Sequence, residues 1–238
     1  MKAETVKNIF ISGANRGLGL SLTRQCLQAG NQVFAGTRSP SAPLAELEGQ
    51  YPGAMHLVVI DVSSEESVKA AAEAVGTKAG RLDLIINNAA LLYRESAVNP
   101  IERIDLDAAA ETLDVNAIGP LRVLKYFLHL LDTGPRKMVV NISSEAGSIA
   151  DCQRDAWYAY CMSKAALNMA SMILQNYLRE KGVKVLAVHP GWMRTRMGGE
   201  DAKYDTQESA RAILALSEKE WSIDGPVFVD HTGAPMRW

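Results

Sequence analysis

Tyr160 and Lys164 stand four residues apart, and a phenol and an ammonium group at this spacing could transfer a proton. Residues four apart lie on the same face of a helix, so the two groups would point into the same space. A nearby cation favours the phenolate, and we therefore expect Lys164 to lower the pKa of Tyr160. The pair predicts a proton donor that works near neutral pH.

A glycine-rich turn near the start of the chain predicts what this proton donor works with. Gly13, Gly17 and Gly19 follow a short apolar run and open a helix-length segment that begins at Leu18. Such glycines permit a tight turn, and with Asn15 between them they let the backbone approach a pyrophosphate at the helix N-terminus. The alternative is a turn with a structural role alone. We expect a dinucleotide here, and hydride transfer as the reaction.

Two arginines indicate which nicotinamide cofactor the turn would bind. In an NAD site, an acidic residue at the end of the second strand binds the ribose hydroxyls. Here that strand end has no acidic residue and is followed by Arg38, and Arg16 lies inside the glycine turn. Two guanidinium groups suit a 2′-phosphate, which predicts NADP(H). The alternative is that both arginines are solvated surface charges.

Further cofactor contacts are expected where the third and fourth strands end. Asp61 and Val62 follow the third strand, and Asp61 could accept a hydrogen bond from an adenine amino group. Asn88 and Ala89 follow the fourth strand. Ligands of open α/β sheets bind at this carboxyl edge.

The elements that must position these residues alternate between strands and helices. Expected strands are Asn8–Ser12, Gln32–Gly36, His56–Ile60, Leu82–Ile86, Lys137–Ile142, Val183–His189 and Pro226–Val229. Expected helices are Leu18–Ala29, Ser63–Lys78, Leu106–Leu131 and Ala156–Lys181. This alternation predicts an α/β fold: one Rossmann-type, doubly wound domain over residues 1–238, with a central parallel seven-stranded sheet and helices on both faces.

Composition excludes several classes of function. The net charge is −2, without the basic excess that nucleic acid or an anionic membrane would attract. We find no signal peptide and no apolar run long enough to span a bilayer, so we expect a cytoplasmic protein. The three cysteines and four histidines are dispersed, which predicts neither a disulfide framework nor a metal site.

Two helical segments carry more apolar residues than one sheet can cover. Ile118–Leu131 and Trp157–Leu178 are apolar on more than one face, whereas a helix that packs only on a sheet has a single apolar stripe. The surplus predicts contact with another subunit, in a homodimer or homotetramer.

Taken together, these residues resemble the short-chain dehydrogenase/reductase family over essentially the whole chain. The resemblance rests on Gly13–Gly19, Asn87–Ala90, Asn116, Ser144, Tyr160, Lys164 and Pro190–Thr195, which occur in the family's order. A narrower resemblance, to the C-factor and sniffer branch of carbonyl reductases, rests on Asn141–Ile149, Tyr158–Tyr160, His189–Trp192 and the ending at Trp238. The departures are small: Ser12 replaces a common threonine and Ala90 a common glycine.

The resemblance implies a role for each catalytic residue. Tyr160 would protonate a carbonyl oxygen, Lys164 would hold the ribose and lower the tyrosine pKa, and Ser144 would donate a hydrogen bond to the carbonyl oxygen. Asn116 would position Lys164 and a relay water. Neither Tyr158 nor Ser143 is expected to share these roles, and His189 is expected to be structural or to line the cofactor.

The segment after the sixth strand is expected to pass the nicotinamide. It contributes Pro190 and Gly191, the backbone of Met193 and the hydroxyl of Thr195. The loop that follows is short, with Gly198–Lys203 as its most flexible-looking part, so we expect an open pocket. Candidate apolar walls are Cys152, Trp157, Trp192 and Met197.

These expectations combine into one function. We expect an NADPH-dependent oxidoreductase that reduces the carbonyl groups of small aldehydes, ketones or quinones, with Tyr160 as general acid. A signalling protein that senses NADP(H) with little turnover is the alternative, but sensing does not require Ser144, Tyr160 and Lys164. A structural protein on this fold is disfavoured by the intact glycine turn.

Overall fold

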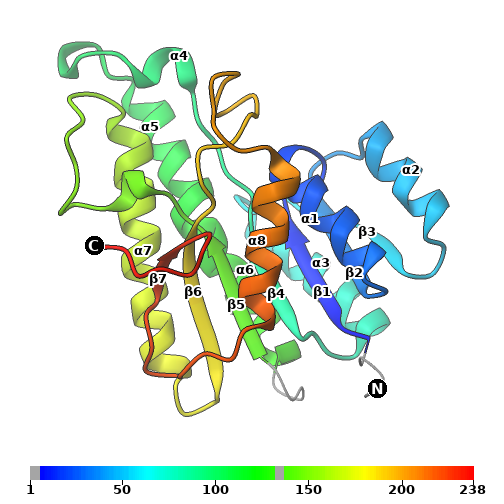
Figure 1. The fold of residues 1–238 in the computed structure, drawn as a ribbon. Coiled ribbons are helices and arrows are strands. Elements are labelled where there is room, and N and C mark those ends of the chain that lie inside the picture. The colour runs from blue at the N-terminus through cyan, green and yellow to red at the C-terminus, as the bar shows by residue number, and fades with distance from the viewer. Residues whose placement is uncertain (1–5, 132–136) are drawn as a thin grey trace.

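The computed structural model describes residues 6–131 and 137–238, and its centre is a parallel seven-stranded sheet (Figure 1). The strands run in the order β3-β2-β1-β4-β5-β6-β7. Their bounds are β1 Asn8–Ser12, β2 Gln32–Thr37, β3 Met55–Val59, β4 Leu84–Asn87, β5 Lys137–Ile142, β6 Val183–His189 and β7 Phe228–Asp230. The expected sheet is confirmed, although the last strand begins later because Pro226 has no N–H to donate.

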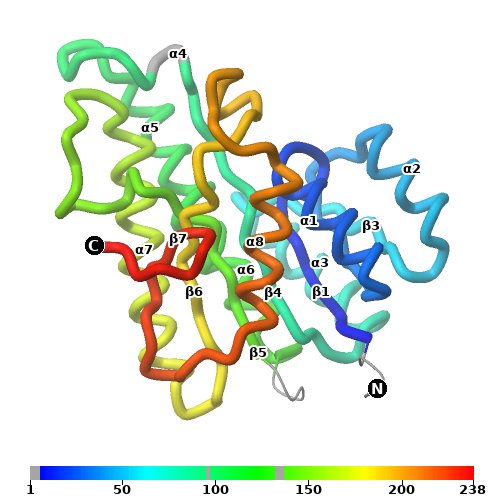
Figure 2. The backbone as a smooth tube through the Cα atoms, viewed as in Figure 1, coloured from blue at the N-terminus to red at the C-terminus, as the bar shows by residue number. Residues whose placement is uncertain are grey.

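Helices cover both faces of this sheet, as Figure 2 also shows. The helices are α1 Gly17–Gln28, α2 Ala42–Gln50, α3 Glu65–Ala79, α4 Arg94–Ala97, α5 Leu106–Leu113, α6 Gly119–Phe127, α7 Tyr158–Leu178 and α8 Thr206–Glu218. One core cluster packs α1, α2 and α8 against the sheet, and a second packs α3, α6 and the end of α7 on the opposite face. This is the doubly wound arrangement that the alternation predicts.

Strand β1 shows why the strands are almost continuously apolar. Ile9 and Ile11 lie in the first cluster, whereas Phe10 lies in the second and meets Phe127 with ring centroids 4.4 Å apart. Successive side chains point to opposite faces, and both faces of this sheet are covered. Every position of the strand therefore has to be apolar or small.

The long helix expected over Leu106–Leu131 is not regular. Helix α5 ends at Leu113, a π-helical turn runs over Asp114–Ile118, and α6 then continues to Phe127. A short 3-10 turn, Leu128–Leu131, completes the segment. Single π-turns occur inside α-helices frequently at functional sites, and this one contains Asn116.

All seven strands are parallel, so their carboxyl ends meet along one edge, at the top of Figure 1. The strand order reverses between β1 and β4, and the crevice at such a point is where ligands bind in this architecture. Within the part of the chain that the structure describes, no helix is both long and apolar enough to cross a membrane.

Candidate active site

The glycine turn forms a close contact between two parts of its own backbone. Gly13 has a φ of +67° and Gly17 a φ of +52°, a region that L-residues rarely adopt. A Cβ atom on Gly19 would lie 2.1 Å from the carbonyl oxygen of Gly13, so no side chain fits there. The turn leads directly into α1, whose N-cap residue, Arg16, makes no side-chain cap. The first N–H groups of α1 therefore remain available for an anion.

Asn88 holds this turn in place from the neighbouring strand. Its side-chain nitrogen donates to the carbonyl oxygens of Ser12 and Gly13, each at 3.0 Å. In return, the hydroxyl of Ser12 accepts from the backbone N–H groups of Asn88 and Ala89, each at 3.1 Å. The side-chain nitrogen of Asn88 thus stabilises the turn by its hydrogen bonds to the backbone. The hydroxyl of Ser12 makes the bonds on the other side, and these do not require the methyl group of a threonine.

The residues expected to bind the adenosine part of the cofactor lie near the ends of β2 and β3 and in the glycine turn. Arg16 and Arg38 are both exposed, and Arg38 directly follows β2. Burial pushes the pKa of Asp61 upward, but hydrogen bonds from Ser63 and the charges of Arg38 and Arg122 bring it below its usual value. Asp61 is therefore a stable carboxylate, and its Oδ1 already accepts from the N–H of Ser63 at 2.9 Å.

Tyr160 and Lys164 lie on α7 and face the same space, as their spacing predicts. The Lys164 ammonium nitrogen is 5.7 Å from the centroid of the Tyr160 ring. Lys164 is only 2% exposed, and it donates a hydrogen bond to the carbonyl oxygen of Ile142 at 2.7 Å. The end of β5 therefore anchors the lysine below the tyrosine.

The pKa of Tyr160 lies above its ordinary value in the folded chain, rather than below it. Burial raises the pKa of Tyr160 to about 12, against a smaller lowering by its hydrogen bond with Ser144. Burial also lowers the pKa of Lys164 to about 8. Loss of water is the largest cause of both shifts, and it moves each group toward its neutral form.

Asn116 uses the π-turn to reach across to two other segments. Its side chain accepts from the N–H of Leu91 at 2.7 Å and donates to the carbonyl of Leu91 at 2.9 Å. It also donates to the hydroxyl of Ser163 at 3.0 Å. Asn116 thus contacts the residue beside Lys164, whereas the lysine ammonium is held by Ile142. Its expected action on Lys164 is indirect in this arrangement.

The two neighbouring serines after β5 have different surroundings. The Ser143 hydroxyl donates to Asn168 at 2.6 Å and is buried, which fits a structural role. The Ser144 hydroxyl donates to Glu145 at 2.8 Å, and Ser144 is near enough to Tyr160 to lower the pKa of the phenol. Only Ser144 therefore lies beside the acid, as the family pattern implies.

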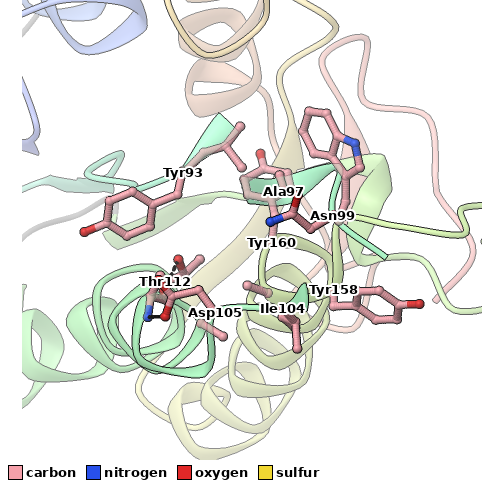
Figure 3. A pocket seen from close by; sticks show the side chains of 13 residues that line it. Tyr93, Ala97, Asn99, Ile104, Asp105, Thr112, Tyr158 and Tyr160 are labelled. Carbon is pink, nitrogen blue, oxygen red and sulfur yellow. Dashed lines mark hydrogen bonds between the residues drawn. The ribbon is translucent and has the colours of Figure 1, made fainter. Parts of the chain in front are cut away.

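The two neighbouring tyrosines also differ, as Figure 3 shows. The Tyr158 hydroxyl turns away from Tyr160 and donates to the carbonyl of Asp155 at 3.2 Å. Trp157 precedes them with a φ of +68°, the left-handed region in which a bulky residue is strained. The backbone N–H of Trp157 donates to the carbonyl of Ala97 at 2.7 Å, and the indole ring packs edge-on against the Tyr160 ring. Strain of this kind is often retained at functional sites.

A narrow pocket opens beside Tyr160, between α5 and the start of α7 (Figure 3). Of the expected apolar walls, Trp157 lines it, whereas Cys152, Trp192 and Met197 do not. The missed lining comes from the segment after β4 and from α5: Leu92, Tyr93, Ala97, Asn99, Ile104, Asp105, Ala108, Ala109 and Thr112. These residues belong to no local sequence motif. They lie at the site because the tertiary fold brings the segment after β4 and α5 next to Tyr160.

Several hydrogen bonds hold together the segment after β6, including the start of its glycine-rich part. Gly191 has a φ of +83°, and a Cβ there would lie 2.8 Å from the Tyr204 ring. The N–H of Gly198 donates to the Thr195 hydroxyl at 3.0 Å, and the N–H of Arg194 donates to the carbonyl of Tyr204 at 2.8 Å. These bonds fix the loop before α8.

This loop brings two expected cofactor contacts to the glycine turn. A Cβ on Gly17 would lie 3.6 Å from the Thr195 methyl group, so Thr195 faces the start of α1. Met193, two residues after Gly191, packs against the core cluster on that face. The glycine turn follows β1, Ser144 follows β5 and Thr195 follows β6, so these groups lie along the carboxyl edge of the sheet, with Tyr160 beside Ser144.

Comparison with known proteins identifies the family. The sequence profile described as short chain dehydrogenase matches residues 7–205. The chain belongs to this family. Among curated short-chain dehydrogenase relatives, C-signal of Myxococcus xanthus is 36% identical over 159 residues, which cover 67% of this chain and 94% of that protein.

Solved short-chain dehydrogenase structures support the narrower resemblance. The NADPH-bound carbonyl reductase from chicken fatty liver is 32% identical, with a TM-score of 0.90 over 98% of this chain and 99% of that one. The carbonyl reductase Sniffer of D. melanogaster is 28% identical, with a TM-score of 0.91 over 98% of this chain and 100% of that one. The resemblance to the C-factor and sniffer branch is confirmed, and the protein is an oxidoreductase of this family.

Proposed function

We propose that this protein is an NADPH-dependent carbonyl reductase that converts small aldehydes, ketones or quinones to alcohols. The observation that carries the proposal is the proximity of Ser144 to Tyr160, which lines a pocket, with the Lys164 ammonium 5.7 Å from the centroid of the Tyr160 ring. A carbonyl oxygen placed there would meet two hydroxyl donors. The chicken carbonyl reductase, bound to NADPH, shares the fold over nearly the whole chain and supports the same reading.

The chain's own residues fit NADP(H). The uncapped N-terminus of α1 and the open backbone at Gly17 offer N–H groups to the pyrophosphate. Exposed Arg16 and Arg38 suit the 2′-phosphate, and no acidic residue stands at the end of β2 to bind free ribose hydroxyls. The remaining contacts would come from Gly13, Asn15, Leu18, Gly19, Asp61, Val62, Asn88, Ala89, Pro190, Gly191, Met193 and Thr195.

Of these cofactor residues, Leu18 can contribute only its backbone, because its side chain is 5% exposed and packs in the core. The bracing role of Asn88 leaves the backbone beside it, at Ala89, as the better contact. The cradle would therefore be made mainly of main-chain groups, as the close approach of a phosphate requires.

The proposed chemistry uses the two hydroxyl groups in sequence. Bound NADPH supplies the hydride for the carbonyl carbon. Ser144 donates a hydrogen bond that orients the carbonyl oxygen, and Tyr160 transfers its proton to that oxygen as negative charge develops. The phenolate that remains is stabilised by the Lys164 ammonium, which lies 5.7 Å from the ring centroid. A Tyr160 pKa of about 12 keeps the acid protonated before reaction.

We also propose that the protein assembles at least as a homodimer, with a homotetramer as the larger possibility. Helix α7 exposes one apolar row: Met162 (54%), Met169 (63%), Ile173 (59%) and Tyr177 (64%). Ile118, at the end of the π-turn, is 46% exposed, and Leu121, in the first turn of α6, is 40% exposed. Burying such a row against its own copy is the simplest way to remove it from water, and two-fold symmetry is the commonest arrangement.

A substrate screen tests the proposed function. Purified protein is mixed with NADPH and a panel of aldehydes, quinones and ketones, and loss of NADPH absorbance is followed. We expect turnover with several members of the panel and formation of the matching alcohols. Tight NADPH binding with no turnover on any carbonyl would instead favour a sensing role.

A further inference from the structure

Glu145 contacts the proposed catalytic serine directly. A carboxylate can only accept, so the hydrogen of the Ser144 hydroxyl points at the Oε2 of Glu145, 2.8 Å away. The Ser144 oxygen accepts from the N–H of Ala146 at 3.1 Å. The single hydroxyl hydrogen of Ser144 is thus taken by Glu145, and the Ser144 oxygen acts as an acceptor.

The carboxylate that receives this hydrogen is itself held in place. Arg154 donates to the other oxygen of Glu145, Oε1, at 2.7 Å. The backbone N–H of Glu145 donates to Nδ1 of His189 at 3.2 Å, which fixes the start of the short 3-10 turn Glu145–Gly147. Each oxygen of the carboxylate therefore has its own partner, and one of them faces the active site.

This arrangement determines which way the hydroxyl groups of the site point. Ser144 has one hydrogen, and while Glu145 holds it, Ser144 cannot donate to the Tyr160 oxygen, which is the interaction by which Ser144 lowers the pKa of Tyr160. A negative charge beside this pair also opposes a second negative charge on the tyrosine. In agreement, the charge of Glu145 raises the pKa of Tyr160, after the larger effect of burial, whereas Arg154 lowers it.

We propose that Glu145, held by Arg154, is a positioning residue that takes the hydroxyl hydrogen of Ser144 and so keeps Tyr160 in its proton-donating form. The inference rests on the proposed reaction, for which Tyr160 must be protonated in the reductive direction and ionised in the oxidative one. Glu145 accordingly favours carbonyl reduction over alcohol oxidation. When a carbonyl binds, the Ser144 hydrogen turns from Glu145 to the carbonyl oxygen.

Other titratable groups near Tyr160 are present in every variant compared below. They are Lys164 and Cys161 on α7, and Tyr158, Tyr93 and Asp105 in the lining of the same pocket. The Glu145 and Arg154 side chains are 45% and 37% exposed, so water and salt weaken their influence. We therefore expect a shift of about half a pH unit rather than the one to three units of a buried pair.

The test measures ionisation of Tyr160 without requiring turnover. The chain has seven tyrosines, so the phenolate absorbance of a matching Tyr160→Phe variant is subtracted in each background. We expect Tyr160 to ionise at lower pH in Glu145→Gln than in the wild type, and at the same or higher pH in Arg154→Gln. Asp155→Asn, which removes an exposed carboxylate from the same loop, should leave it unchanged.

Kinetics provide the second readout. In Glu145→Gln, the alkaline limb of carbonyl reduction should move to lower pH, and the ratio of alcohol oxidation to reduction at fixed pH should rise about threefold. Equal Tyr160 ionisation in the wild type and Glu145→Gln, or no ionisation in either while circular dichroism shows the fold intact, overturns the proposal. A wild type that reduces no carbonyl would refute the proposed function but not prevent the absorbance test.

Discussion

Gly19 approaches Gly13 so closely that a Cβ atom on Gly19 would lie 2.1 Å from the carbonyl oxygen of Gly13 and 2.5 Å from the side-chain nitrogen of Asn88. The contact joins the first turn of α1 to the end of β1. It explains why the turn needs glycine at a position where φ itself is ordinary. The backbone on the other side of the turn is thereby presented to a ligand.

The first prediction concerns this contact. In Gly19→Ala, the methyl group would displace Gly13 and Asn88, so we expect NADPH affinity to fall at least about tenfold, or roughly 1.4 kcal/mol. Gly49→Ala is the matched control, because a Cβ there meets nothing within 4 Å. Fluorescence titration measures both. Unchanged NADPH affinity in Gly19→Ala would show that the contact is not needed for binding.

The second prediction concerns cofactor choice. Charge-assisted hydrogen bonds from Arg16 and Arg38 should make NADPH bind at least about tenfold more tightly than NADH, or roughly 1.4 kcal/mol. Arg38→Asp should abolish or reverse this preference, whereas Arg211→Asp, an exposed change on α8, should preserve it. Equal affinities of the wild type for NADPH and NADH would show that neither arginine binds the 2′-phosphate.

The third prediction concerns the charge of Lys164. Burial lowers its pKa from 10.5 to about 8, so the unfolded chain binds more protons between these values and stability rises with pH there. Lys164→Met removes this dependence. Its free energy of unfolding relative to the wild type should fall by about 1–3 kcal/mol between pH 7 and pH 10.

Denaturant melts at the two pH values measure this difference. Replacement of the exposed Lys181 by Met is the control and should show no such trend. A stability difference between Lys164→Met and wild type that does not change with pH would mean that Lys164 is charged and well solvated in the folded protein.

The fourth prediction concerns assembly. Light scattering should give at least twice the mass of one chain at micromolar concentration, because the α7 row needs a cover. Ile173→Glu should yield monomers, since it places a charge in the row, while its 59% exposure leaves the protomer fold intact. Val59→Glu, at a 64% exposed position on β3, should stay assembled. A monomeric wild type would require another explanation for the row.

Much of this architecture could be predicted from the sequence, because the patterns involved are local. The alternation of apolar runs gave the seven strands to within a few residues, and the spacing of Tyr160 and Lys164 placed both on one face of α7. The glycine turn was equally clear, since its φ values and close contacts admit little else.

The remainder depends on tertiary surroundings. The π-turn at Asp114–Ile118 interrupts the long helix expected over Leu106–Leu131, and it is recognised only from the structure, in which Asn116 bonds to Leu91 and Ser163. The raised pKa of Tyr160 follows from burial, which spacing alone does not show. The left-handed φ of Trp157 could not be predicted either, because glycine and asparagine are the residues that usually adopt this conformation.

The fifth prediction tests the central claim most directly, by removing one oxygen atom. Tyr160→Phe keeps the ring against Trp157 but has no proton to give, whereas Tyr158→Phe loses only a bond to the Asp155 carbonyl. On any carbonyl that the wild type reduces, we expect Tyr160→Phe to lose at least about a hundredfold in kcat while binding NADPH normally, and Tyr158→Phe to remain close to wild type. Substantial turnover in Tyr160→Phe would contradict the assignment of Tyr160 as the acid.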